Sequence, residues 1–320
     1  MILLVVLYIL LSVSYVLSKA VLDYIAPIFF VGIRMVTAGL LLLGFQYFLD
    51  RKNWYFNKRD IPLLFAISLF HVYLMFTLEF WGLQYLPSFK CSFLFTLTPF
   101  IMAFFEWIVF SEIMSTKKWI GLIIGFLGVI PILLQDASPD EIKSSFFVFS
   151  LPELSVLGAV ISGAFAWILI KKLVKRNNYT PSSINGIAML WGGILALITS
   201  LLIENRPLLK FPPESTKINL LGIYVQDYLF GQNGSILLII AFYMFSLILL
   251  ANIGFYNLYI HLLKKYSVTF ISFAGFMAPL FTGILGWMFL GEQLSVIFFV
   301  SVFIVSFGLY IFYQDELQAK

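Results

Sequence analysis

The chain has 320 residues, of which 61% are hydrophobic and only 11% are charged, and its mean hydropathy is +0.99. Soluble domains carry about 25% charged residues, so this composition excludes an ordinary soluble globular protein. The net charge of +4 comes from basic residues that flank apolar runs and do not gather in one patch, which argues against a nucleic-acid partner.

The apolar residues fall in runs of about twenty, the length that an α-helix needs to cross the hydrocarbon core of a bilayer. Backbone groups in lipid must bond within their own segment, so continuous runs of this kind indicate helices and not a barrel. The sequence therefore predicts an all-α polytopic membrane protein with ten transmembrane helices. In chain order the expected spans are 2–18, 27–49, 62–85, 88–110, 118–135, 152–171, 183–203, 235–262, 267–290 and 294–313.

Lysine and arginine concentrate in every second connection between these spans, for example at Arg51, Lys117 and Lys264. The positive-inside rule then puts both termini in the cytoplasm, as expected for a multi-pass protein of the bacterial inner membrane. The first apolar run has no basic residue before it, so we expect a retained span and not a cleaved signal peptide. Cys91 is the only cysteine, which excludes an internal disulfide or a cysteine metal cage. We expect no cofactor and no metal.

The stretch Leu97–Glu112, "LTPFIMAFFEWIVFSE", has a counterpart in Met277–Glu292, "MAPLFTGILGWMFLGE". The two prolines are separated by an offset of 180 (279 − 99). Other pairs share that offset: Trp107 and Trp287, Glu112 and Glu292, Ser115 and Ser295, and Gly128 and Gly308. A looser echo relates residues 19–27 to residues 171–181, and it places Tyr15 and Trp167 at matching positions.

This internal repeat predicts two five-helix halves, residues 1–135 and 152–314, joined by a linker at 136–151. Five crossings are an odd number, so the second half enters the membrane from the opposite side. Such inverted repeats are common in secondary transporters, which bind substrate near the middle of the membrane between the halves. The long loop at 204–234 is expected outside, with a short interfacial helix in "INLLGIYVQDYLF".

The repeated prolines and glutamates have structural interpretations. Pro99 and Pro279 lie inside apolar runs, where neighbouring helices can satisfy the freed carbonyl groups, and we expect each to bend its helix or act as a hinge. Glu112 and Glu292 precede the fifth and tenth helices, and an acidic residue near a helix N-terminus favours a capping role over proton carriage. The glycines of "GLIIGFLG" at 121–128 favour close helix packing over a nucleotide site.

Four ionisable residues within the expected spans are candidates for transport, because a charge in lipid is costly. Arg34 is expected near the outer interface, where it can snorkel, and it either anchors the helix or forms an intraprotein pair, or binds an anion. His71 and Glu79 lie along roughly one stripe of the third span. His71 is either a neutral, hydrogen-bonded core histidine or a functional group. Glu79 is either a counter-ion for a cationic group or a proton carrier, or else a hydrogen-bonded acid at the outer rim. Glu106 is expected to pair with Lys117 or Lys118 near the cytoplasmic end of the fourth span.

A candidate substrate site combines aromatic, amide and acidic side chains from several spans. Its expected members are Tyr15, Glu79, Trp167, Asn252 and Tyr256. Such a site would suit a flat ring joined to a cation, through stacking and cation–π attraction.

The proline, the terminal glutamate and the glycine sixteen residues after it, together with Arg34 in "VGIRMVTAGLLLL", resemble the EamA-type drug/metabolite transporters. Two features depart from the pattern: Ala188 stands where the second half would repeat Arg34, and the loop at 204–234 is long. The resemblance implies transport of a small metabolite without ATP hydrolysis. It also points to S-adenosylmethionine uptake, or exchange for S-adenosylhomocysteine, in an intracellular bacterium, with an amino-acid or other metabolite exporter as the alternative.

Other functional classes find less support in the sequence. A polytopic membrane enzyme needs clustered His, Asp or Glu residues, whereas the chain has two histidines and no HExxH-like motif. There is no P-loop lysine motif for ATP, and no polar-lined helix or filter-like loop for a channel. We therefore expect a transporter that acts as a monomer in the lipid bilayer on a small-molecule substrate.

Overall fold

We analysed a computed structural model of the chain. It describes residues 2–48, 56–111, 114–134, 150–176, 179–204, 208–209, 218–220, 223–225, 231–266, 268–291 and 295–318. The α-helices are α1 (Ile2–Val21), α2 (Pro27–Phe48), α3 (Ile61–Ile67), α4 (Met75–Leu83), α5 (Ser88–Leu94), α6 (Thr98–Phe110), α7 (Thr116–Leu134), α9 (Leu151–Arg176), α10 (Pro181–Ile203), α11 (Gly231–Leu247), α12 (Tyr256–Leu263), α13 (Val268–Ala274), α14 (Ala278–Leu290) and α15 (Val296–Gln318). Short 3₁₀ segments are η2 (Lys58–Asp60), η4 (Phe95–Leu97) and η6 (Gly275–Met277), and π-helical segments are η3 (Ser68–Leu74) and η5 (Ile248–Phe255).

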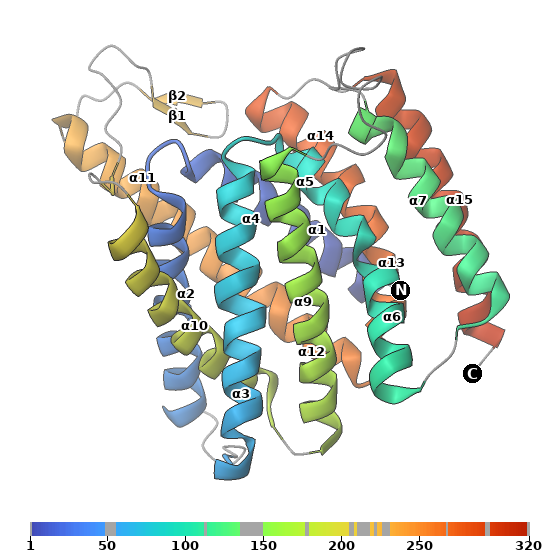
Figure 1. Cartoon of the computed structure of the whole chain (residues 1–320). Helices are drawn as coiled ribbons and strands as arrows, with labels where there is room; N and C mark the ends of the chain where they lie inside the picture. Colours follow the sequence, from blue (N-terminus) through green and yellow to red (C-terminus); the bar gives the residue numbers. More distant parts are fainter. Residues whose placement is uncertain are drawn as a thin grey trace.

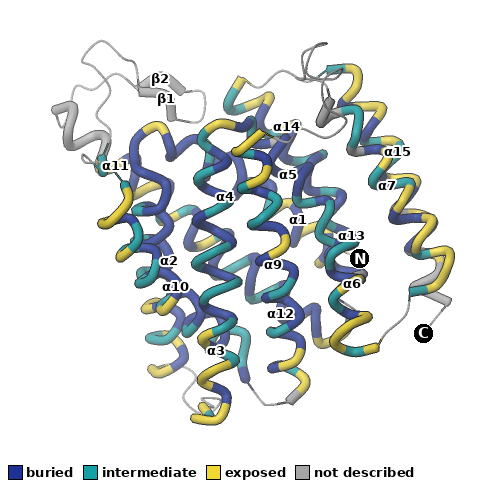
Figure 2. The backbone as a smooth tube through the Cα atoms, in the orientation of Figure 1, coloured by how far each residue is buried: buried dark blue, intermediate teal, exposed yellow. Residues whose placement is uncertain are grey.

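Among the described residues, eight helical segments are long and apolar enough to cross a membrane. Large apolar side chains lie on the outside of the bundle, as at Trp107 (56% exposed), Trp287 (59% exposed) and Phe303 (75% exposed). Charged side chains such as Arg34 and Glu79 are buried inside it. Figure 2 shows buried segments through the middle of the bundle and exposed ones along peripheral helices such as α15. This inside-out distribution is that of a multi-pass membrane protein, since lipid solvates the apolar exterior.

The repeat found in the sequence recurs in the boundaries of the helices. The segment α5–η4–α6 begins at Ser88, and the segment α13–η6–α14 begins 180 residues later at Val268, with every internal boundary at the same offset. The π-helical segments also correspond, because η3 begins at Ser68 and η5 at Ile248. Local sequence thus imposes the same breaks on the two segments of each pair, although most of their side chains differ.

The two prolines expected to act as bends or hinges lie at matching positions in their helices. Each proline occupies the first turn of its helix, α6 or α14, directly after a 3₁₀ turn. Proline is tolerated there because the first N–H groups of a helix have no partner within the helix. The same helices end at Ser111 and Gly291, both in the left-handed region with φ of 55° and 70°. Each of these two segments is therefore α-helical on both sides of a three-residue 3₁₀ stretch, and the proline stands at the start of its second α-helix.

Two pairs of helices that the repeat matches also pack together. Helix α2 lies along α10, and α7 lies along α15 at one side of the bundle (Figure 1). Glycine permits the close approach of α7 and α15, because a Cβ atom on Gly308 would lie 2.6 Å from the carbonyl oxygen of Gly121. The "GLIIGFLG" stretch is thus a helix-packing surface.

The connection before α11 differs from expectation in its described part. The predicted interfacial helix is wrong, because β1 (Ile218–Leu220) and β2 (Ile223–Val225) form an antiparallel hairpin that pairs Ile218 with Val225. Ile218, Ile223 and Val225 are β-branched and Tyr224 is aromatic, and residues of these types favour strands over helices. Glu112, Glu292 and most of the linker at 136–151 lie outside the described residues, so their predicted roles stay predictions.

Glu204 and Leu208 are hydrogen-bonded to the start of α2. The carboxylate of Glu204 accepts hydrogen bonds from the backbone N–H groups of Ile28 and Phe29, each at 2.8 Å. Beside it, the backbone N–H of Ala26 donates to the carbonyl of Leu208 at 2.8 Å. Glu204 thus satisfies N–H groups that have no partner within the helix, and it fixes the end of α10 to the start of α2.

Candidate functional site

A central cavity lies between segments of both halves. Its walls come from α1, α2 and α4–α6 on the first half, and from α9 and α12–α14 on the second, with η4, η5 and η6 between them. About 860 Å³ within these walls is free of protein atoms, including the part open to solvent. Helices from both halves therefore build one site, the arrangement in which membrane transporters hold their substrates.

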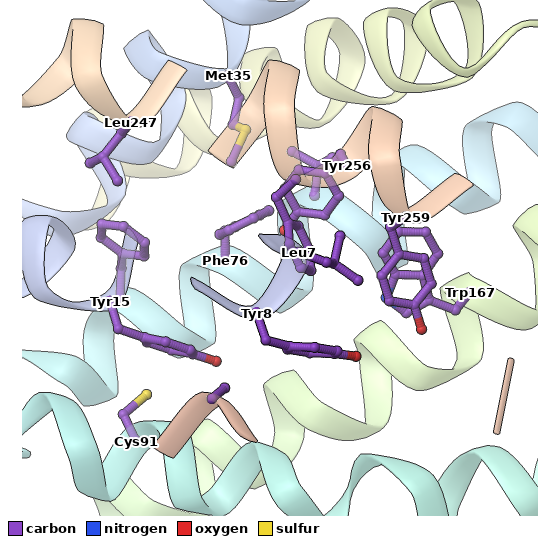
Figure 3. Close-up of a cluster of buried hydrophobic side chains, with 14 of the residues drawn as sticks. Leu7, Tyr8, Tyr15, Met35, Phe76, Cys91, Trp167, Leu247, Tyr256 and Tyr259 are labelled. Atoms are coloured by element: carbon purple, nitrogen blue, oxygen red, sulfur yellow. The ribbon is translucent and has the colours of Figure 1, made fainter. Parts of the chain in front are cut away.

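Stacked aromatic rings form one wall of the cavity. The ring of Trp167 on α9 stacks on Tyr259 of α12 with centroids 3.8 Å apart and planes 22° apart. Tyr256, one turn earlier on α12, lies nearly parallel to Trp167 at 6.0 Å. Figure 3 shows Trp167 and Tyr259 face to face, with Tyr256 beside them. Such a wall offers π-faces to a planar or cationic ligand.

Helix α1 supplies another part of the cavity wall. Tyr8, Leu11, Tyr15 and Ser18 all line the cavity, and their spacings of three, four and seven residues put them on one helix face. The hydroxyl of Tyr8 donates to the backbone carbonyl of Ile271 on α13, and Figure 3 shows the rings of Tyr8 and Tyr15 side by side on α1. The hydrogen bond fixes α1 to the second half at the level of the cavity.

One basic and one acidic side chain lie on the wall. Arg34 on α2 is 1% exposed and Glu79 on α4 is 6% exposed, and both line the cavity. They are electrostatic neighbours, yet no ion pair within 4.0 Å joins these two described residues. The expectation that Arg34 snorkels at the outer interface is wrong, because its side chain is enclosed in the bundle.

His71 and Asn252 lie behind the cavity wall. The ring of His71 packs nearly perpendicular to the rings of Trp167 and Tyr256, with ring centroids 4.6 Å and 5.1 Å apart. Neither ring nitrogen of His71 has a hydrogen-bond partner among the described residues. The amide of Asn252 is directed at sulfur atoms, 3.0 Å from Met35 Sδ and 3.6 Å from Met189 Sδ. Both residues sit in π-helical segments, whose wider turns rotate neighbouring residues away from the α-helical stripe.

Glu106 forms a buried ion pair that lies outside the cavity. Its carboxylate is 2.5 Å from Lys171 Nζ on α9, so the predicted pairing with Lys117 or Lys118 is wrong. The prediction chose lysines that are near in the sequence, whereas Lys171 is 65 residues away and meets Glu106 because α6 packs against α9. A second ion pair, Lys90 with Glu153 at 3.0 Å, joins α5 to the start of α9.

The cavity thus gathers four of the five expected substrate-site residues, namely Tyr15, Glu79, Trp167 and Tyr256. Asn252 is not on its wall. Sequence reasoning missed Tyr8 and Tyr259, although helical spacing from Tyr15 and Tyr256 was a signal for each. In the part of the chain that the structure describes, no group of three or more His, Cys, Asp or Glu side chains is arranged to hold a metal ion.

Comparison with known proteins agrees with this architecture. The model of the EamA-like transporter family matches residues 1–134 and 150–314. A protein of Chlamydia muridarum named "S-adenosylmethionine/S-adenosylhomocysteine transporter" is 30% identical over 309 residues, which is 96% of this chain and 89% of that one. A protein of the same name from Chlamydia trachomatis serovar L2 is also 30% identical, over 96% of this chain and 86% of its own.

A solved structure shares the fold. A chain titled "Crystal structure of protein" superposes with a TM-score of 0.64 and 12% sequence identity, over 100% of this chain and 96% of its own. At this identity the likeness is one of fold.

Proposed function

The chain belongs to the EamA-like transporter family, and from this premise we propose that it carries S-adenosylmethionine across the bacterial inner membrane in exchange for S-adenosylhomocysteine. The Chlamydia relatives align with almost the full length of this chain, and they are named for that activity. The observation that carries the proposal is the composition of the cavity. It offers parallel aromatic faces for a purine ring and a carboxylate for a cationic group of the ligand.

The proposed binding residues are the four expected ones that line the cavity. Trp167 and Tyr256 would hold the adenine ring, and Tyr15 would close over it from α1. Glu79 would attract a cationic group of the substrate. Asn252, His71 and Glu106 would act indirectly: Asn252 by fixing the turn before Tyr256, His71 by buttressing Trp167 and Tyr256, and Glu106 by holding α6 to α9.

We propose that transport proceeds by alternating access between two inverted five-helix halves, residues 1–135 and 152–314. The packing of α2 on α10 and of α7 on α15 supports this proposal, because a two-fold axis brings matched elements together. With ten crossings and the lysine and arginine bias of the connections, both termini would lie in the cytoplasm. The protein would act as a monomer, since each chain contains a whole cavity.

Reconstituted liposomes test the proposal. Vesicles loaded with unlabelled S-adenosylhomocysteine should take up labelled S-adenosylmethionine in a saturable manner, and external S-adenosylhomocysteine should compete. Empty vesicles and vesicles without protein serve as controls, the first separating exchange from uniport. Inhibition by amino acids, with no uptake of the adenosyl compound, would transfer the assignment to an amino-acid exporter of the same family.

A further inference from the structure

The two charges on the cavity wall allow a more specific inference, which rests on the proposed function. Arg34 and Glu79 come from different helices, α2 and α4, and both are enclosed in the bundle. No hydrogen bond or ion pair joins either side chain to any described residue. Two opposite charges in one cavity that do not pair with each other need partners from elsewhere, because burying an unpaired charge is costly.

The surroundings of Arg34 stabilise a cation without satisfying its hydrogen bonds. The carbon at the centre of its guanidinium lies 5.0 Å from the ring centre of Phe80, 5.1 Å from that of Phe76 and 5.9 Å from that of Phe30. These rings attract the charge but accept no strong hydrogen bond, and the Nε atom has no partner. The aromatic rings therefore hold the guanidinium in place while its N–H groups remain available as hydrogen-bond donors. Their planar, forked arrangement suits a carboxylate.

The internal repeat indicates that the fold does not require this pair. The position that matches Arg34 in the second half is Ala188, which is buried against α2 without any charge. The position 180 residues after Glu79 is Tyr259, which stacks on Trp167. The scaffold thus forms at both matched positions with uncharged side chains, so the charges have a use other than folding.

We propose that Arg34 and Glu79 together recognise the dipolar head group of an α-amino acid. Arg34 binds its carboxylate, and Glu79 binds its ammonium group. A ligand with only one charge leaves the other wall charge unpaired, and a neutral ligand leaves both unpaired. S-Adenosylmethionine and S-adenosylhomocysteine share this head group and differ at the sulfur. Arg34 and Glu79 therefore bind the part that the two exchange partners have in common.

The test measures binding of four compounds to the purified full-length protein in nanodiscs. They are S-adenosylhomocysteine, its decarboxylated analogue, its desamino analogue, and 5′-methylthioadenosine, which lacks both charges. With unmutated protein, removing either charged group should weaken binding about 10- to 100-fold, as expected for a hydrogen bond to a buried charge. Equal affinity for all four compounds would overturn the proposal without any variant.

Variants assign each charge to its partner. Arg34→Gln should lose about 10- to 100-fold affinity for S-adenosylhomocysteine yet bind the decarboxylated analogue as the unmutated protein does. Glu79→Gln should show the same behaviour toward the desamino analogue. Arg59→Gln, which removes an exposed arginine that is not part of the cavity lining, is the matched control for the charge lost in Arg34→Gln and should change nothing. Equal loss for every compound in Arg34→Gln and Glu79→Gln would mean a structural role and contradict the assignment.

This test separates the inference from the proposed substrate. If no adenosyl compound binds, the proposed function fails, and the same comparison is made with free amino acids, their methyl esters and the corresponding amines. Tighter binding of the free amino acids, lost in Arg34→Gln, would retain the recognition pair on another substrate. Absence of binding by any amino acid, or equal binding of esters and amines, would overturn it.

Discussion

At the scale of the residue, the molecule uses its few buried charges in two ways. Arg34 and Glu79 face the cavity without pairing, whereas Glu106 and Lys171 pair directly and lie outside it. The second arrangement fastens two helices, and under our proposal the first leaves its charges for a ligand. On that proposal, the absence of a protein partner, and not burial alone, distinguishes the charges that bind substrate.

The Glu106–Lys171 pair supports a prediction about stability. Glu106→Gln should remove the carboxylate that faces the buried ammonium of Lys171 and cost about 3–5 kcal/mol, because a broken buried ion pair keeps its desolvation penalty. Thermal denaturation in detergent should show this as a lowered melting temperature. The double variant Glu106→Gln/Lys171→Met should recover most of the loss, and a double variant as unstable as the single one would contradict this account.

At the scale of the element, interruptions of the helices are placed with regularity. The π-helical segments η3 and η5 and the 3₁₀ turns η4 and η6 all lie in helical segments that contribute to the cavity wall, beside the unbroken helices α1, α2 and α9. Irregular turns lower the cost of bending a helix locally. Ion pairs at both ends of α9 fasten it to α5 and α6, so we expect these three helices to move together.

The proline breaks support a second prediction. Pro99→Ala and Pro279→Ala should restore a donor at the start of α6 or α14 and favour a straighter helix. Binding of S-adenosylhomocysteine should change little, while exchange in liposomes should slow about tenfold or more, a rise of about 1.4 kcal/mol in the barrier.

The matched control is Pro131→Ala, because Pro131 lies inside α7 with no 3₁₀ turn beside it. This variant should exchange substrate at the unmutated rate. Parallel losses of binding and exchange in the Pro99 and Pro279 variants would indicate misfolding and remove the hinge interpretation.

At the scale of the whole molecule, the repeat relates positions that should lie on opposite sides of the membrane. Tyr85 and Lys265 are 180 residues apart, occupy equivalent turns after α4 and α12, and are both exposed. An inverted arrangement places Tyr85 outside and Lys265 in the cytoplasm. Lys58 begins the helical segment Lys58–Leu83, which ends just before Tyr85, so Lys58 should also lie in the cytoplasm.

Cysteine labelling in cells tests this arrangement. In a Cys91→Ser background, which removes the single buried thiol, Tyr85→Cys should react with a membrane-impermeant maleimide added outside. Lys265→Cys and Lys58→Cys should react only after the cells are opened. Labelling of Tyr85→Cys and Lys265→Cys from the same side would contradict inversion while leaving the fold itself intact.

The sequence by itself determined the class of the protein, the offset of the repeat and the approximate ends of the apolar segments. These features are local, because chain length against bilayer thickness and the chemistry of proline act within one segment. The sequence also predicted one site that contains Tyr15, Glu79, Trp167 and Tyr256, since each is a polar or amphipathic residue in an apolar run, and all four line the cavity.

Only the tertiary structure decided which of these side chains meet. The partner of Glu106 proved to be Lys171 on another helix, Arg34 proved to be enclosed by three phenylalanines, and Asn252 proved to lie behind the wall. The π-helical turns near His71 and Asn252 rotate side chains by amounts that a regular helical pattern does not contain. Contacts between helices depend on how whole segments pack, and no spacing within a single segment specifies them.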